Sequence, residues 1–139
     1  MSDLVDHLPT VPILVIEDDE HVGDLIATVL NEVPGWAATV VTDASAAIAT
    51  LQQVAIKAVV LDINLPGISG LELLPLLRAD PAWREPPVIL MSANDHQPGI
   101  REAVSEGLAV TFLAKPLDLD VLIETVQATL IARDPNSLQ

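Results

Sequence analysis

Residues 11–20 read VPILVIEDDE, an apolar run of six that stops abruptly at four consecutive acids. An apolar run of this length is typical of a parallel strand that is buried on both faces. The next segment repeats apolar side chains at helical spacing and is closed by Pro34-Gly35; its apolar residues are Val22, Leu25, Ile26, Val29 and Val33. The stretch therefore predicts one strand–helix unit whose strand carries a cluster of acids at its carboxyl end.

The same strand–helix unit recurs four more times along the chain. The expected strands are 37–41, 58–61, 87–91 and 110–113, and the expected helices are 44–54, 71–78, 100–106 and an amphipathic one marked by Leu119, Leu122, Ile123, Val126 and Leu130. Parallel strands need crossover connections, and right-handed crossovers on both faces give three layers. The predicted fold class is therefore α/β, a doubly wound, flavodoxin-like (βα)5 sandwich with a five-stranded parallel sheet. We expect the domain to occupy residues 11–132, between a flexible N-terminal extension (1–10) and a C-terminal tail (133–139).

The charge of the chain limits what it is expected to bind. Twenty acids against six bases give a net charge of −14, which would repel nucleic-acid phosphates and anionic membranes. We therefore expect neither direct nucleic-acid binding nor a membrane contact. Cysteine is absent, which excludes thiolate metal sites, and the N-terminus lacks the basic and apolar regions of a signal peptide. These features favour a cytoplasmic protein.

Reactive side chains stand at the carboxyl ends of four predicted strands. In chain order they are Glu17 and Asp18, Asp62, Ser92, and Lys115. Ligands of doubly wound sheets bind at these strand ends, near the point where the strand order reverses. Three carboxylates in one place repel each other unless a cation lies among them, and oxygen ligands without His or Cys suit Mg2+ or Mn2+. A carboxylate also attacks phosphorus in aspartyl-phosphate chemistry, in which a metal and a lysine neutralise the transferring group.

Four motifs together resemble the response-regulator receiver family of two-component signalling. They are ILVIEDD (13–19), LDINLPGISG (61–70), MSA (91–93) and Lys115-Pro116. The resemblance implies that Asp62 is the phosphoacceptor and that Asp18 binds the metal directly. It also implies that Glu17 contacts the metal through a water and that the backbone carbonyl of Asn64 is a further ligand.

The same resemblance implies a switch rather than an enzyme, apart from assistance to its own phosphorylation and dephosphorylation. Ser92 takes the position of the switch hydroxyl, Lys115 that of the phosphate-contacting lysine, and Phe112 that of the aromatic whose rotamer changes on activation. The implied partners are a sensor histidine kinase or phosphotransfer protein and an unknown downstream protein. Partner binding or phosphorylation-linked homodimerisation is expected on the face of the 100–106 helix, the 110–113 strand and the last helix.

Two departures from the family pattern lie on that face. Leu108-Ala109-Val110 replaces the commoner small-then-acidic run, with one extra residue between Gly107 and Lys115. Pro98-Gly99 is expected to weaken the start of the 100–106 helix, because proline lacks a donor and glycine is flexible.

Other functions fit the residues less well. Phosphatases of the haloacid-dehalogenase kind carry an Asp-x-Asp pattern whose second Asp is the acid/base. In this chain Asn64 occupies the position of that second Asp, and no cap domain fits this length. A flavodoxin-type nucleotide binder needs a Ser/Thr/Gly-rich loop after the first strand, where this chain has acids. A phosphorylation-independent interaction module of the same fold remains the main alternative. No output domain is visible, so the chain is either a stand-alone regulator or part of a longer one.

Overall fold

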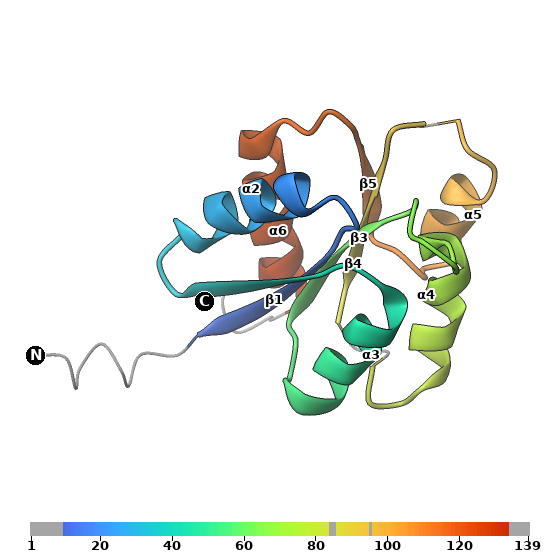
Figure 1. The fold of residues 1–139 in the computed structure, drawn as a ribbon, viewed down its shortest axis with the longest axis horizontal. Helices are drawn as coiled ribbons and strands as arrows, with labels where there is room; N and C mark the ends of the chain where they lie inside the picture. Colours follow the sequence, from blue (N-terminus) through green and yellow to red (C-terminus); the bar gives the residue numbers. More distant parts are fainter. Residues whose placement is uncertain (1–9, 84–85, 95, 134–139) are drawn as a thin grey trace, which may run out of the picture.

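Strands and helices alternate strictly along the described parts of the chain. The computed structural model describes residues 10–83, 86–94 and 96–133 (Figure 1). These ranges contain β1 (Val11–Ile16), α2 (Glu20–Asn31), β2 (Trp36–Val41), α3 (Ala44–Gln53), β3 (Ala58–Asp62), α4 (Gly70–Ala79), β4 (Val88–Ser92), α5 (Ile100–Ser105), β5 (Thr111–Ala114) and α6 (Leu119–Arg133). The predicted extension and tail fall almost wholly outside these ranges, so the domain limits stay a prediction.

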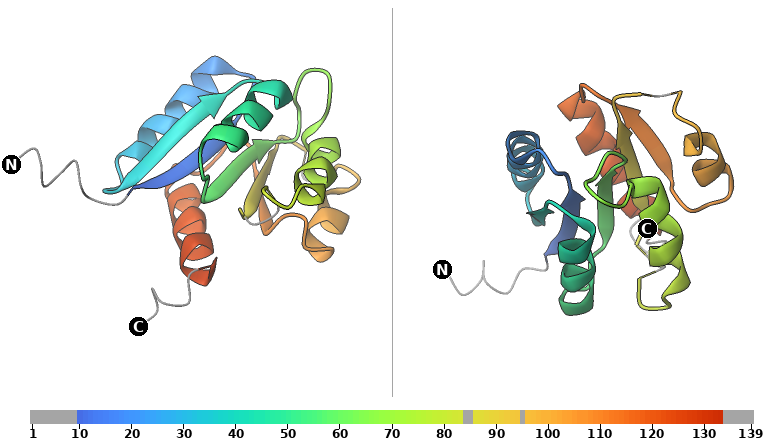
Figure 2. Two further views of the ribbon diagram at one scale, coloured as in Figure 1. Left: turned by 90° about the horizontal axis from the view of Figure 1, so that it is seen from below. Right: turned by 45° about the vertical axis from the view of Figure 1, so that its right-hand side comes forward.

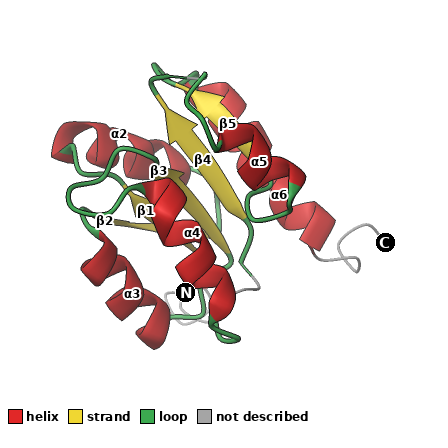
Figure 3. Cartoon of the chain, turned by 90° about the vertical axis from the view of Figure 1, so that its right-hand side faces the viewer, coloured by secondary structure: helices red, strands yellow, loops and turns green. Residues whose placement is uncertain are grey.

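The five strands form one parallel sheet in the order β2-β1-β3-β4-β5. Helices α2 and α6 cover one face of the sheet, and α3, α4 and α5 cover the other (Figures 2 and 3). The chain runs outward from β1 to β2 and then crosses back to β3, so the strand order reverses between β1 and β3. The predicted doubly wound α/β fold is confirmed.

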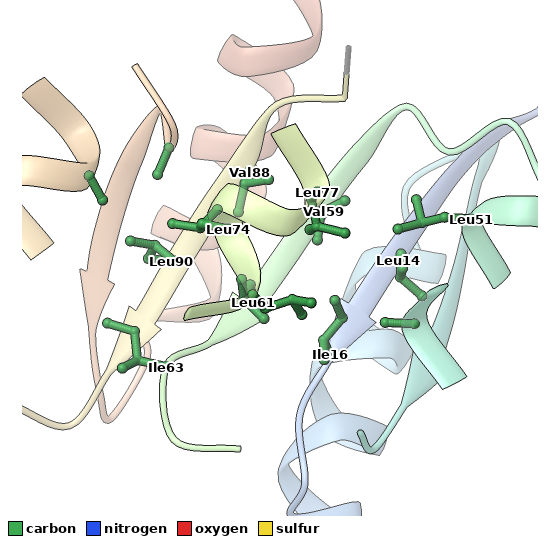
Figure 4. Close-up of a cluster of buried hydrophobic side chains, with 14 of the residues drawn as sticks. Leu14, Ile16, Leu51, Val59, Leu61, Ile63, Leu74, Leu77, Val88 and Leu90 are labelled. Carbon is green, nitrogen blue, oxygen red and sulfur yellow. The ribbon is translucent and has the colours of Figure 1, made fainter. Parts of the chain in front are cut away.

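Each face of the sheet has its own aliphatic core. Leu14 and Ile16 of β1 belong to a cluster that also contains Leu51 of α3, Leu61 of β3 and Leu74 of α4 (Figure 4). The alternate β1 residues join the cluster under α2 and α6. Every residue of β3 and β4 is buried, as expected of central strands covered on both faces. This packing fixes the strand ends from which the candidate site is built.

One helix departs from the amphipathic pattern that the sequence predicts. Leu25 is expected on the inner face of α2, yet it is 53% exposed, and α2 ends at Asn31, before Val33. The last helix buries Leu122 and Val126, as the sequence predicts. Helical spacing alone misplaced Leu25, because the inward arc of a helix depends on its neighbours.

The start of α4 packs directly against the end of β3. The hydroxyl of Ser69 accepts a hydrogen bond from the backbone N–H of Glu72, and the Glu72 side chain accepts one from Ser69, which completes a capping box. A Cβ on Gly70 would lie 2.5 Å from the carbonyl oxygen of Asp62 and 2.9 Å from the Cα of Ile63. Only glycine lets the helix approach this backbone so closely.

Within the described ranges, no helix combines the length and apolar character needed to cross a bilayer.

Candidate functional site

Three carboxylates meet where the strand order reverses. Glu17 and Asp18 follow β1, and Asp62 ends the neighbouring strand β3. One carboxylate oxygen from each lies within 4.8 Å of the others. Glu17 and Asp62 are buried, with 0% and 1% of their surface exposed, whereas Asp18 is open to solvent. The arrangement offers a set of oxygen ligands with one side accessible.

Lys115, which directly follows the edge strand β5, extends its side chain to this cluster. Its backbone N–H donates to the carbonyl of Ser92, which ties the segment after β5 to the end of β4 (2.8 Å). Its ammonium Nζ lies 2.6 Å from Glu17 Oε1 and 3.0 Å from Asp62 Oδ2. The peptide bond from Lys115 to Pro116 is cis. A single partly buried cation is therefore shared between two buried carboxylates.

Backbone donors hold the remaining oxygens of both buried acids. The Asn64 N–H donates to Asp62 Oδ1 (3.0 Å), and the Asp19 N–H donates to Glu17 Oε2 (3.3 Å). Asp19 also caps α2, because its carboxylate accepts hydrogen bonds from the backbone N–H groups of His21 and Val22. The orientation of each acid is thus fixed by the turn that follows its strand.

The crowding of acids changes the protonation of Glu17. Burial and hydrogen bonding to Asp62 raise the pKa of Glu17 from its ordinary 4.5 to about 7, although Lys115 and the Asp19 N–H act in the opposite direction. Burial alone would lower the pKa of Lys115, but its bonds to Glu17 and Asp62 outweigh burial and raise it. Near neutral pH the cluster therefore retains part of a proton on Glu17, and a cation would displace that proton.

Ser92 lies at the end of β4 beside Asp62, but its hydroxyl is engaged elsewhere. Ser92 Oγ donates to the Asn94 carbonyl (2.8 Å) and accepts from the Asn94 N–H (3.0 Å). Phe112 of β5 is half-buried against the core cluster beneath α5. The side chains of Ser92 and Phe112 thus lie outside the hydrogen-bonded acid–lysine cluster, although their strands adjoin it.

The structure unites four of the residues predicted from the sequence: Glu17, Asp18, Asp62 and Lys115. Sequence reasoning missed Asn94, the partner of Ser92. An asparagine two residues after a strand end is a turn residue by chemistry, and that was the available signal. The sequence also did not indicate that Lys115 pairs with Glu17 as closely as with Asp62.

An apolar groove opens beside Lys115. It has a volume of about 200 Å³ and lies between Val22, Leu25 and Ile26 of α2 and the segment 115–119. The exposed acids Glu20, Asp24 and Asp118 belong to the same two segments. The groove therefore combines apolar walls with acidic surroundings next to the site.

Comparison with known proteins identifies the family. A sequence profile of the response regulator receiver domain matches residues 13–127. The sensory transduction protein RegX3 of Mycobacterium tuberculosis H37Rv is 36% identical over 119 residues, which cover 85% of this chain and 50% of that protein. The transcriptional regulatory protein FixJ of Azorhizobium caulinodans is 38% identical over 121 residues, 87% of this chain and 56% of that protein. The chain thus spans about half the length of the curated relatives it matches.

Solved structures agree with this match. The receiver domain of the Francisella response regulator 1452 superposes with a TM-score of 0.79 at 28% identity, covering 90% of this chain and 100% of that one. The receiver domain of the Pseudomonas aeruginosa sensor histidine kinase PA1611 has a magnesium ion coordinated in its active-site cleft. It superposes with a TM-score of 0.76 at 27% identity, covering 87% of this chain and 98% of that one. The chain therefore belongs to the response regulator receiver domain family.

Proposed function

We propose that this protein is a phosphorylation-controlled switch that accepts a phosphoryl group on Asp62. The observation that carries the proposal is the setting of Asp62, a buried carboxylate that is bonded to Lys115 and lies within 4.8 Å of two further carboxylates. The Lys115 ammonium and the Asn64 N–H bind its two oxygens, so the carboxylate is held in place beside a cation that could also bind a negatively charged phosphoryl group. We further propose a cytoplasmic location, in keeping with the receiver-domain match.

The residues present fit a bound Mg2+ or Mn2+. The donors are all oxygens, and three of them come from carboxylates that lie within 4.8 Å of one another, where a cation would relieve their mutual repulsion. We assign direct coordination to Asp18, to Asp62 and to the backbone carbonyl of Asn64, and contact through a water to Glu17. When bound, the metal neutralises charge on the carboxylates and on phosphoryl oxygens.

Phosphoryl transfer forms one bond and breaks another. A carboxylate oxygen of Asp62 attacks the phosphorus, and the bond between phosphorus and the donor breaks, so its electron pair leaves with the donor. The backbone N–H of Asn64 and the Lys115 ammonium hold the two oxygens of Asp62 and so orient the nucleophile. The Lys115 ammonium is already within hydrogen-bond distance of Asp62, so it also donates a hydrogen bond to an oxygen of the new phosphoryl group.

The phosphorylated state is read through Ser92 and Phe112. We propose that the Ser92 hydroxyl turns to the phosphoryl group and that Phe112 moves inward on β5. The face of α5, β5 and α6 then changes its affinity for a downstream protein or for a second copy of the chain. This face exposes Val110 (47%) and Val121 (41%), apolar side chains that suit a protein contact.

The phosphodonor is a sensor histidine kinase or a phosphotransfer protein, and we assign its docking to the groove beside Lys115. A donor helix with an apolar stripe would cover Leu25, and basic residues along that stripe would meet the acids of α2 and of the segment 115–119. The position of the groove next to Lys115 would bring a donor phosphate to Asp62.

The test is phosphorylation of the purified protein by acetyl phosphate with magnesium. Intact-mass spectrometry should show one phosphoryl adduct that requires the metal and is absent in Asp62→Asn. The control is Asp43→Asn, which alters an acid that caps α3 and lies outside the cluster. Undiminished labelling of the Asp62 variant would refute the proposal and favour a phosphorylation-independent interaction module.

A further inference from the structure

The C-terminal end of helix α5 is firmly anchored. The backbone N–H groups of Leu108 and Ala109 both donate to the carbonyl of Ala103, and Gly107 adopts the left-handed backbone (φ 80°) that closes a helix. The Val110 N–H then donates to the carbonyl of Val88 on β4 (2.8 Å). This end of the helix is therefore tied both to itself and to the sheet.

Arg78 adds a side-chain anchor at the same place. It lies in the last turn of α4, half-buried, and its Nε and Nη2 donate to the Leu108 carbonyl at 3.0 and 2.9 Å. Its Nη1 donates to the carbonyl of Pro86 at 2.8 Å. The planar guanidinium thus joins three segments that are distant in sequence: the end of α4, the entry to β4 and the connection from α5 to β5.

The N-terminal end of α5 is held in a different way: Ile100 is buried in the core, and its N–H donates to the Gln97 carbonyl at a long 3.4 Å. Its N-cap is Gly99, with φ 97° and no side-chain hydrogen bond to the helix. The preceding turn is held by Asn94, whose side chain accepts from the His96 N–H (3.0 Å) and whose backbone binds the Ser92 hydroxyl. Ser92 is therefore bonded to the turn that precedes the N-terminal end of α5.

We propose that Arg78 is a positioning residue that pins the C-terminal end of α5, so that a change at Ser92 moves only its N-terminal end. The proposal rests on the proposed function, because phosphorylation of Asp62 supplies the change at Ser92. A hydroxyl has one proton to donate, so Ser92 gives up the Asn94 carbonyl when it donates to a phosphoryl oxygen. The freed turn then shifts Gly99, while Leu108 and Val110 stay fixed.

In this arrangement α5 pivots about its fixed C-terminal end. Without an anchor, a six-residue helix would respond by sliding or unwinding as a whole, and the entry to β5 would move with it. With Arg78 in place, displacement is concentrated at residues 96–102, on the outer side of α5, where a partner would detect it. Arg78 thus determines where the signal emerges, although the carbonyls that it binds, those of Leu108 and Pro86, belong neither to the acid cluster nor to the turn at Ser92.

Amide hydrogen exchange, resolved by residue, tests both halves of the proposal. The proteins are the unaltered chain, Arg78→Met, Arg78→Lys and the control Lys57→Met, which removes an exposed positive charge. Each is measured without metal and again with magnesium and beryllofluoride as the phosphoryl mimic. Without the mimic, Arg78→Met should speed exchange of the Leu108, Ala109 and Val110 amides by roughly tenfold or more, because charge-assisted hydrogen bonds are lost. Arg78→Lys should fall between the two, and Lys57→Met should match the unaltered chain.

The response to the mimic separates positioning from simple support of the fold. In the unaltered chain and in Lys57→Met, exchange should change at residues 96–102 and stay constant at 108–110. In the Arg78 variants the mimic should bind with unchanged affinity, yet its effect should spread to 108–110. The proposal is overturned if the unaltered chain responds equally at both ends of α5, or if the Arg78 variants keep its pattern. If Arg78→Met does not fold, Arg78→Lys decides both comparisons by the same criteria.

Failure of the proposed function gives a different result. If the mimic changes exchange nowhere in the unaltered chain, the assignment of Asp62 is wrong and the coupling to Ser92 falls with it. The anchoring role of Arg78 is still decided by the comparison without the mimic, where unchanged exchange at 108–110 overturns it.

Discussion

Replacing Glu17 by glutamine should remove most of the pH dependence that the acid cluster gives to the stability of the metal-free protein. The pKa of Glu17 is about 7 in the folded chain and 4.5 as an ordinary value. Between these values the folded state keeps a proton that the unfolded state releases. Raising the pH therefore favours the unfolded state, and stability falls from about pH 4.5 until Glu17 ionises near pH 7.

The size of this loss follows from the two pKa values. At about 1.4 kcal/mol for each pH unit, the full difference costs the folded state about 3 kcal/mol, and most of this falls between pH 5 and pH 8. The raised pKa of Lys115 adds no slope in this window, because both the folded and the unfolded lysine stay charged there. Glutamine has the shape of glutamate without the charge, and Lys115 keeps its bond to Asp62 in the variant.

The assay is urea unfolding with a chelator present, at several pH values from 5 to 8, for the unaltered protein and for Glu17→Gln. Subtracting the two curves cancels the contributions of the other acids. The difference should favour the variant by about 2 to 3 kcal/mol more at pH 8 than at pH 5. Saturating magnesium should stabilise the unaltered protein at pH 8, by about 2.7 kcal/mol at a hundred times its dissociation constant. Parallel curves for the two proteins would show that the pKa of Glu17 is not raised in the folded protein.

Three further predictions concern single residues around the cluster. Asp18→Asn should weaken magnesium binding at least about tenfold and more than Glu17→Gln does, measured by metal titration, with the exposed Asp24→Asn unchanged; equal affinities in all proteins would mean that the metal site is misplaced. Leu25→Ser should slow phosphorylation by the cognate kinase but not by acetyl phosphate, since Leu25 lines the groove and not the acid cluster; equal loss with both donors would place its effect in the fold. Gly70→Ala should destabilise the protein by roughly 1 to 3 kcal/mol in thermal or urea unfolding and slow phosphorylation, because the new Cβ meets the backbone of Asp62 and Ile63; an unperturbed variant would show that α4 adjusts freely.

The sequence was sufficient to predict that the three acids meet, because parallel strands bring their carboxyl ends to one edge. Glu17, Asp18 and Asp62 could be placed together from strand ends alone, and the structure places their oxygens within 4.8 Å. The pairing of Lys115 with Glu17 could not be predicted in this way. It depends on how the segment after β5 turns back over the sheet, which strand spacing does not encode.

Hydrogen bonds from side chains to backbone groups distant in the sequence could not be predicted from the sequence either. Arg78 bonds to the Leu108 carbonyl, thirty residues further along the chain, and nothing in either local sequence indicates that contact. The exposure of Leu25 has the same origin, because the neighbouring segment 115–119 leaves a groove instead of covering α2. Periodicity predicts that a face is apolar, whereas tertiary packing decides whether it is covered.

The hydrogen bonds of Ser92 give the switch its direction. In the described state the hydroxyl donates to a neutral carbonyl, that of Asn94 (2.8 Å), and a net neutral bond contributes about 1 kcal/mol. A phosphoryl oxygen on Asp62 would be a charged acceptor, and bonds to charged groups contribute about 1.5 to 3 kcal/mol. The Asn94 backbone loses little when released, because Asn94 is exposed and water replaces Ser92. The exchange therefore favours the phosphorylated arrangement by about 0.5 to 2 kcal/mol, a shift of roughly two- to thirtyfold in population. A gain of this size biases α5 without locking it, so a partner that binds only the displaced helix would complete the transition.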